Sequence, residues 1–236
     1  MRRTFASVIA LSAVAGIASL AGAAPTFNFA VNYNGSLLYS TATNPGTFTV
    51  NPGPGGTWVV SGSYAAGPAF FNFDLTLKDD PFATSNFNLT NTSGALGHFT
   101  TSLSLAVNSP LAAPITSQGS ISGSIGDNSL TFDGASLDTL PGSAFYTATI
   151  DGAPFKTLYP DPSNVTAFGG LTETLNATGF SNLAAFQPTA TIGIINDFTL
   201  TADDSVGMIS RFDVTPTPGA VSVFGLAGLV AARRRR

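Results

Sequence analysis

The chain has 236 residues, of which 9% are charged and none is cysteine, and its formal net charge is −4. The lack of cysteine excludes disulfides, cysteine nucleophiles and thiolate metal sites. The low charge content excludes disorder driven by charge repulsion, and the net acidity excludes nucleic acid as a partner.

Residues 1–23 predict a secretory signal peptide with a short apolar helix. Arg2 and Arg3 supply its basic start, residues 8–20 are apolar, and Ala21-Gly22-Ala23 is a small-residue cleavage signal. A retained membrane anchor is the alternative, but the apolar segment is short and ends in a cleavage pattern. The two arginines match part of a twin-arginine signal without the rest of it, so general secretion is favoured. We expect the mature chain to begin near Ala24.

Residues 24–215 predict one all-β domain. This segment holds three basic and all thirteen acidic residues, which gives it a formal charge of −10. Such a charge disfavours binding to anionic membrane surfaces. The segment is long enough to bury a large core without disulfides, and its abundant Ser, Thr and Asn are expected on the outward faces.

Alternation of apolar and polar residues recurs along this segment, whereas helical periodicity hardly appears. The clearest strand is residues 71–77, in which every second residue is Phe or Leu. Asn34-Gly35 and Asp151-Gly152 are predicted hairpin turns, because these residues tolerate positive φ. Residues 44–56, rich in proline and glycine, are predicted to form a loop. Other strand residues are expected within 27–33, 37–39, 58–64, 87–89, 102–107, 115–125, 130–132, 147–158, 171–180, 191–200 and 206–214. About ten to twelve strands in one domain favour a sandwich or a jelly roll.

The end of the chain, residues 216–236, differs from the body. It reads Pro216-Thr217-Pro218-Gly219, then thirteen uncharged residues from 220 to 232, then Arg233, Arg234, Arg235 and Arg236. Thirteen helical residues span roughly 20 Å, less than the ~30 Å hydrocarbon core of a bilayer. The segment therefore predicts a short hydrophobic helix, weakly held in a membrane, with its arginines on the cytoplasmic side.

This pattern of Pro-x-Pro, apolar segment and arginine cluster resembles the PEP-CTERM sorting tail of bacterial envelope proteins. The resemblance implies that an exosortase-type membrane enzyme recognises Pro216, Thr217 and Pro218 and removes or replaces the tail. Thr217 stands where the family usually has glutamate. The implied location is the periplasm, the outer cell surface or the extracellular matrix. The implied partners are the export machinery and the exosortase-type enzyme, with transient membrane contact through the tail. An exopolysaccharide is a further candidate partner of the body.

The residues of the body give little support for catalysis. A serine triad needs a histidine, and His98 is the only one, with no G-x-S-x-G motif in the chain. One histidine and no cysteine cannot make a typical zinc site. A glycosidase needs two carboxylates, but Glu173 is the sole glutamate and no acid lies in a diagnostic motif. We therefore expect that the protein is not an enzyme.

Calcium is the more serious metal candidate. Asp79 with Asp80, Asp203 with Asp204, and the pair Asp127 and Asp133 could supply oxygen ligands from loops. The chain has no D-x-D-x-D-G run, and solvated turn carboxylates are the competing interpretation. No cofactor is expected, with calcium as the open alternative.

Glycan binding would use exposed aromatic rings as stacking platforms. Trp58 and Tyr64 share one face of a predicted strand and are the main candidates, although packing into the core is the more common use of such rings. Further candidate rings are Tyr33, Tyr39, Tyr146 and Tyr159. The leading hypothesis is an exported, non-enzymatic structural or adhesive protein of the envelope or extracellular matrix. The alternatives are a carbohydrate-binding module and a calcium-stabilised adhesin domain.

Overall fold

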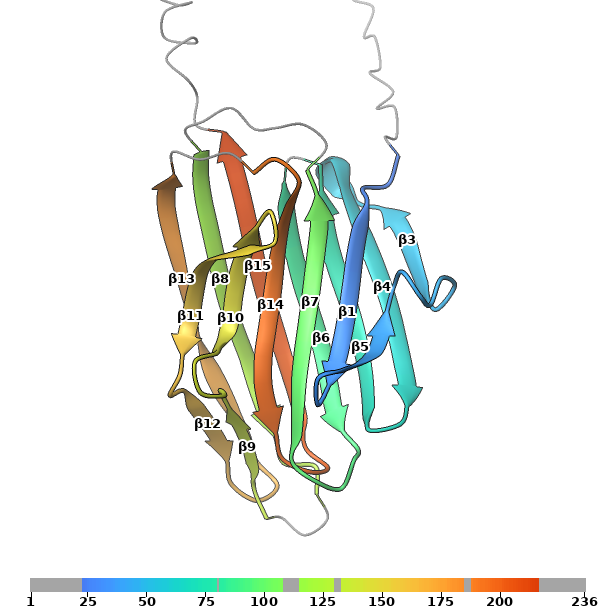
Figure 1. Ribbon diagram of the computed structural model, residues 1–236. Helices are drawn as coiled ribbons and strands as arrows, with labels where there is room; N and C mark the ends of the chain where they lie inside the picture. The colour runs from blue at the N-terminus through green and yellow to red at the C-terminus, as the bar shows by residue number, and fades with distance from the viewer. Residues whose placement is uncertain (1–22, 80, 108–114, 130–132, 185–187, 217–236) are drawn as a thin grey trace, which may run out of the picture.

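The computed structural model describes residues 23–79, 81–107, 115–129, 133–184 and 188–216. Their strands form two antiparallel sheets packed face to face, so the predicted all-β sandwich is confirmed (Figure 1). The predicted signal-peptide helix and tail helix lie outside these residues. No helix formed by the described residues has the length and apolar character needed to cross a bilayer.

One sheet has eight strands, with the main order β11-β10-β14-β7-β1-β2; β9 pairs with β14, and β12 pairs with β9. Its strands are β1 (Phe27–Tyr33), β2 (Ser36–Ser40), β7 (Gly97–Ala106), β9 (Ala135–Asp138), β10 (Ala144–Ile150), β11 (Ala153–Pro160), β12 (Asn164–Ala167) and β14 (Thr191–Leu200). β14 therefore lies in the interior of this sheet, although it is the second-last strand in the chain.

The other sheet has seven strands in the order β13-β8-β15-β6-β5-β4-β3. Its strands are β3 (Phe48–Pro52), β4 (Thr57–Ala66), β5 (Ala69–Lys78), β6 (Phe82–Asn91), β8 (Ile115–Gly126), β13 (Thr172–Ala184) and β15 (Ser205–Pro216). A 3-10 turn, Pro54–Gly56, precedes β4. The last strand, β15, lies between β8 and β6.

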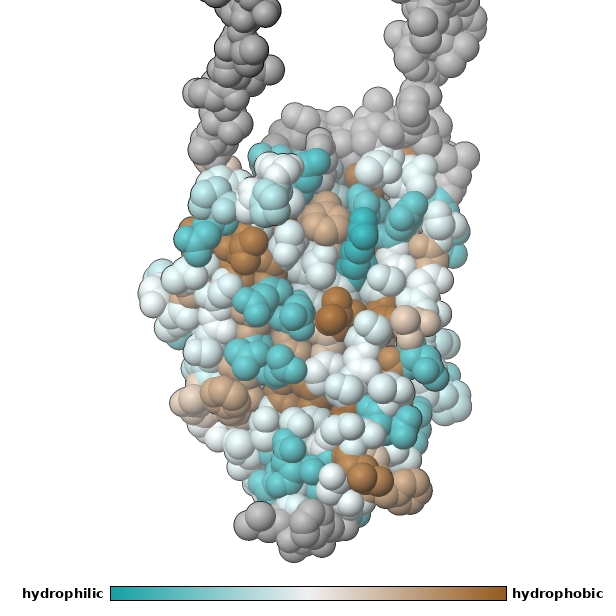
Figure 2. All heavy atoms as spheres, turned by 180° about the vertical axis from the view of Figure 1, so that it is seen from behind, coloured by the Kyte–Doolittle hydropathy of each residue, from teal (hydrophilic) through white to brown (hydrophobic). Residues whose placement is uncertain are grey.

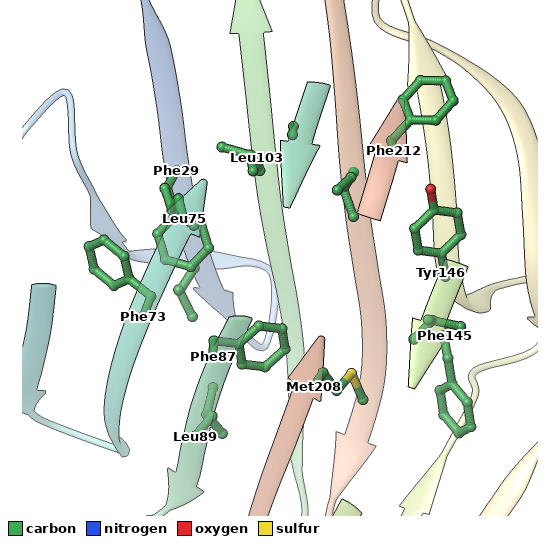
Figure 3. Packing of buried hydrophobic residues seen from close by; sticks show 14 of the residues in the cluster. Phe29, Phe73, Leu75, Phe87, Leu89, Leu103, Phe145, Tyr146, Met208 and Phe212 are labelled. Carbon is green, nitrogen blue, oxygen red and sulfur yellow. The ribbon is translucent and has the colours of Figure 1, made fainter. Parts of the chain in front are cut away.

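The core fills the space between the sheets with aromatic and aliphatic side chains from both (Figure 3). In β5, the alternation predicted from sequence places Phe71, Phe73, Leu75 and Leu77 inside, all buried. The ring of Phe73 lies 4.6 Å from that of Phe29 in the facing sheet. Burial of this kind contributes about 25 cal/mol for each Å² of apolar surface removed from water. Because the chain has no cysteine, burial and hydrogen bonds must supply its stability.

Both predicted hairpin turns are present. Asn34 and Gly35 take φ values of 49° and 77° between β1 and β2, and Asp151 and Gly152 take 51° and 79° between β10 and β11. Positive φ at both central positions matches the right-handed twist of the flanking strands.

Some sequence-based predictions need correction. Residues 44–56 are not wholly a loop, because β3 (Phe48–Pro52) pairs with β4 as an edge strand. Proline at the end of an edge strand costs no ladder hydrogen bond, so a Pro-rich segment can still contribute a short strand. The described residues contain fifteen strands, more than predicted, because the four-residue strands β9 and β12 were also missed. The strand expected at residues 130–132 lies outside the described residues.

The outer face of the seven-stranded sheet is a mixture of pale and hydrophilic areas with separate hydrophobic patches (Figure 2). Small hydroxyl and amide residues alternate with the core residues, as Asn86 and Asn88 do on β6 and Ser122 and Ser124 do on β8. Ile209 on β15 is an exception, being 51% exposed. The predicted exterior of hydroxyl and amide residues is present on this face, where Asp74 and Arg211 are also exposed.

The start of β1 and the end of β15 lie at the same end of the sandwich, here named the proximal end (Figure 1). There the carbonyl of Thr26 accepts a hydrogen bond from the N–H of Ala106, and Pro216 pairs with Ile115. The opposite end is named the distal end and carries the β1–β2, β4–β5, β6–β7 and β14–β15 turns. Backbone hydrogen bonds join these turns, as from Thr92 to Pro68 and from Asn91 to Asp204.

Candidate functional site

The residues of the predicted sorting motif lie almost wholly beyond the described part of the chain. Pro216 is the last residue of β15, at the proximal end. Thr217, Pro218 and Arg233 to Arg236 are outside the described residues. The structure thus gives the attachment point of the tail and nothing of its own arrangement.

Trp58 and Tyr64 lie on the core-facing side of β4. They pair with Leu77 and Phe71 of β5, and both of these residues are buried. Both Trp58 and Tyr64 are half-buried and pack against the core. The ring of Tyr64 stacks on that of Phe71 at 5.3 Å between centroids. These two rings contribute to packing between the sheets.

The predicted calcium ligands that the structure describes lie at both ends of the sandwich. Asp79 follows β5 at the proximal end, and Asp80 lies outside the described residues. Asp203 and Asp204 occupy the β14–β15 turn at the distal end, where Asp203 takes a φ of 60°. Asp79 therefore lies at the opposite end of the sandwich from Asp203 and Asp204.

Asp127, Asp133 and Asp204 come together at the distal end, and a Ser129 hydroxyl links the first two at 2.8 and 2.5 Å. Hydrogen bonds from the N–H of Gly170, from Ser129 and from the N–H of Gly134 lower the pKa of Asp127. Asp204 is fully buried. Burial raises the pKa of Asp204, and the charges of Asp127 and Asp133 add to the rise, against hydrogen bonds from Thr201 and Asn128.

Protein groups thus already occupy both oxygens of Asp127 and of Asp204. Within the described ranges, no three histidine or acidic side chains are arranged as a metal site. The cluster links the distal loops to one another. The N–H of Gly170, in the β12–β13 turn, donates to Asp127 Oδ2 at 2.8 Å.

The single histidine lies on the outer side of the eight-stranded sheet. His98 Nε2 is 2.5 Å from Asp197 Oδ1, and the Thr100 hydroxyl donates to the same oxygen at 3.1 Å. A catalytic triad needs the carboxylate on one ring nitrogen and the nucleophile on the other. Here the carboxylate and the hydroxyl both lie on the Nε2 side, so this trio joins β7 to β14 without the geometry of a triad.

A polar groove opens where the two sheets meet at β12 and β13, and we name it the β12–β13 groove. Its volume is about 360 Å³, within the range of small-molecule pockets. Its polar lining consists of Tyr159, Asn164, Thr166, Glu173, Thr174 and Asn176. Val165 and Leu175 complete its walls.

The groove runs between two strand edges. β12 pairs with β9 alone, and β13 pairs with β8 alone, so each has one edge outside the sheet ladders. Backbone N–H and C=O groups on such an edge are strong hydrogen-bonding groups that seek partners. The groove thus combines side-chain and backbone donors and acceptors.

Tyr159 joins the two walls. Its hydroxyl donates to the carbonyl of Asn176 at 2.6 Å, and its ring lies 6.1 Å from that of Phe145. Its φ of 53° is unusual for a bulky residue and marks backbone strain. Strain of this kind persists only where the surroundings fix the residue, and it is common at binding sites.

No sequence pattern predicted this groove. Tyr159 and Asn176 lie far apart in the chain, and the four-residue β12 is too short to show a period. Of the lining residues, Glu173 was considered from the sequence as the sole glutamate and Tyr159 as a further aromatic ring for glycan binding. Pro160 and Pro162, which predicted a loop beside Tyr159, were the nearest local indication.

No protein-family model matches this chain, and no curated protein shows significant similarity to it.

Proposed function

We propose that this protein is exported and acts as a non-enzymatic structural or adhesive component of the outer envelope or extracellular matrix. Residues 1–23 would direct export, and residues 216–236 would be recognised by an exosortase-type membrane enzyme. The partners in this proposal are the export machinery, that enzyme and an exopolysaccharide.

The observation that carries this proposal is the position of the chain ends. Thr26 and Pro216 both lie at the proximal end, so a tail held at the membrane leaves the distal end directed away from it (Figure 1). A body attached at one end can present its other end to a matrix or to another cell.

The distal end also carries exposed apolar side chains, as a contact surface would. Leu37 and Leu96 are 57% and 60% exposed near the β1–β2 and β6–β7 turns. Phe168 and Leu171 are 78% and 62% exposed, and the N–H of Leu171 bonds to the carbonyl of Phe168 in the β12–β13 turn. The acidic cluster nearby disfavours an anionic membrane as the partner of this end.

Deleting residues 217–236 tests the sorting part of the proposal, because β15 ends at Pro216 and the body is left whole. We expect the full chain in the envelope or matrix fraction and the deleted form in the periplasm or medium. Changing Arg233 to Arg236 to glutamine should have the same effect, since the positive-inside preference is lost. Unchanged fractionation of both variants would refute sorting by the tail.

A second candidate is a carbohydrate-binding module, and the β12–β13 groove favours it. The groove offers an aromatic ring, amides, hydroxyls and one carboxylate in about 360 Å³. The binding residues would be those of the groove and not Trp58 and Tyr64, because these two rings pack on the core side of β4.

A further inference from the structure

We propose that the β12–β13 groove binds a segment of a neutral polysaccharide. The inference rests on the proposed role in the envelope or matrix and names the class of partner. It assigns binding to Tyr159, Asn164, Thr166, Glu173, Thr174 and Asn176, which line the groove.

The lining matches a ligand rich in hydroxyl groups. A sugar hydroxyl both donates and accepts, so it can pair with the amides of Asn164 and Asn176, with the threonine hydroxyls and with the Glu173 carboxylate. The strand edges that flank the groove add backbone donors and acceptors. Val165, which is only partly buried, supplies apolar surface for the C–H face of a sugar ring, whereas Leu175 belongs to the buried core beneath the groove.

The charge of the groove selects against anionic polymers. Glu173 is the only charged residue in its lining, and none of the described cations, Lys78, Lys156 and Arg211, lies there. The body carries a formal charge of −10, which repels polyanions at longer range. A neutral chain of sugars avoids both penalties.

Two lining residues are held in place before any ligand arrives. The Asn164 amide nitrogen donates to Ser136 Oγ at 3.1 Å and to Asp138, which fixes the orientation of the amide. Its carbonyl oxygen is then the atom suited to accept from a ligand. Tyr159 is fixed by its bond to Asn176 and by its packing on Phe145. Fixed groups lose less entropy on binding.

An extended peptide added to the edge of β13 is the competing occupant. At this point along β13, the Tyr159 hydroxyl already donates a hydrogen bond to the carbonyl of Asn176. The β8–β13 register also shifts between Leu175 and Thr178, which bends the edge and interrupts its hydrogen-bonding pattern. Both features oppose the addition of a peptide strand in the groove. A polysaccharide is therefore favoured over a peptide as the ligand.

Affinity gel electrophoresis of the full chain tests the proposal, with gels containing mixed-linkage β-glucan, xyloglucan or galactomannan, and alginate as an anionic comparison. We expect retardation by at least one neutral polymer and none by alginate. Glu173→Gln and Asn164→Ala should each weaken the interaction about tenfold, as loss of a hydrogen bond worth about 1.4 kcal/mol would. Asp74→Asn is the matched control, because Asp74 is exposed on the outer face of β5 and its change removes one charge outside the groove.

The proposal is overturned if no neutral polymer retards the chain, if the two groove variants bind as well as the Asp74→Asn control, or if alginate is preferred. Retention of an extended peptide that is lost in Glu173→Gln, without retention of polysaccharide, would also overturn it. All three variants change exposed side chains and leave the tail intact. A negative result therefore leaves the fractionation of the tail deletion, and with it the proposed sorting, unaffected.

Discussion

At the scale of the residue, Asn91 holds the distal turns together. It is fully buried at the end of β6. Its amide nitrogen donates to the carbonyls of Ala95 and Leu200 at 2.7 and 2.9 Å, and its Oδ1 accepts from the N–H and hydroxyl of Ser93. One side chain thus satisfies groups from the β6–β7 loop and from the end of β14 in the facing sheet.

Replacing Asn91 by alanine should destabilise the fold by about 3 kcal/mol, because several buried backbone groups lose their partners. For a domain of this size, the corresponding fall in Tm is roughly 6–12 °C. Thermal denaturation followed by circular dichroism measures it.

Asn88→Ala is the control for this measurement, because Asn88 is exposed on the same strand and contacts Asn72 at the surface. We expect a change within about 0.5 kcal/mol there. Equal effects of the two substitutions would show that Asn91 does not have the stabilising role assigned to it.

At the scale of the element, the β10–β11 hairpin is fastened to the start of β14 through Asp151. The Asp151 carboxylate accepts from the N–H groups of Thr189, Ala190 and Thr191 at 2.9, 2.7 and 3.0 Å. Desolvation alone would raise the pKa of Asp151, but these hydrogen bonds and one from the Thr189 hydroxyl outweigh it and lower the pKa to about 2.

This lowered pKa predicts a pH dependence. The stabilisation is fully present above the ordinary pKa of 3.8 and is lost as the pH falls toward 2, because the unfolded chain binds the proton more readily. Asp151→Asn should therefore lower the free energy of unfolding at pH 7 by on the order of 1 kcal/mol, a value reduced for the solvent exposure of the carboxylate.

Urea denaturation of the two proteins at pH 7 and at pH 2 checks this expectation. The difference between them should shrink at pH 2, where about half of the native Asp151 is protonated. A difference of the same size at both pH values would contradict the assignment. Asp74→Asn again serves as the control for removing one surface charge.

The strands that the sequence predicted best are those with one face in the core. The alternation in residues 71–77 indicated both β5 and its buried side, and residues 191–200 match β14. β9 and β12 were missed because four residues show no period, and their pairing depends on contacts made far along the chain. The β12–β13 groove could not be predicted, since its two walls come from different sheets and meet only through the topology.

At the scale of the whole molecule, the body carries an excess of acidic residues, and Asp127, Asp133 and Asp204 come together at its distal end. Hydrogen bonds from Ser129, Gly134 and Gly170 already take up the oxygens of Asp127. This arrangement lets carboxylates connect loops in the way that a bound cation would.

We expect the Tm of the protein to be the same in EDTA and in millimolar calcium. A site saturated at 100 times its Kd would add ~2.7 kcal/mol of stability, and EDTA would remove this. Differential scanning calorimetry in the two buffers is the measurement. A Tm several degrees lower in EDTA would instead support the alternative of a calcium-stabilised adhesin.

If the chain is exported as proposed, the position of the last two strands determines when it can complete its fold. β14 lies between β10 and β7, and β15 lies between β8 and β6, so both fill interior places in their sheets. A chain crossing a membrane from its N-terminus would leave each sheet split until residues 191–216 emerged. Folding would then finish only as the segment next to Pro216 cleared the translocon, and a tail that pauses there would give the split halves time to join.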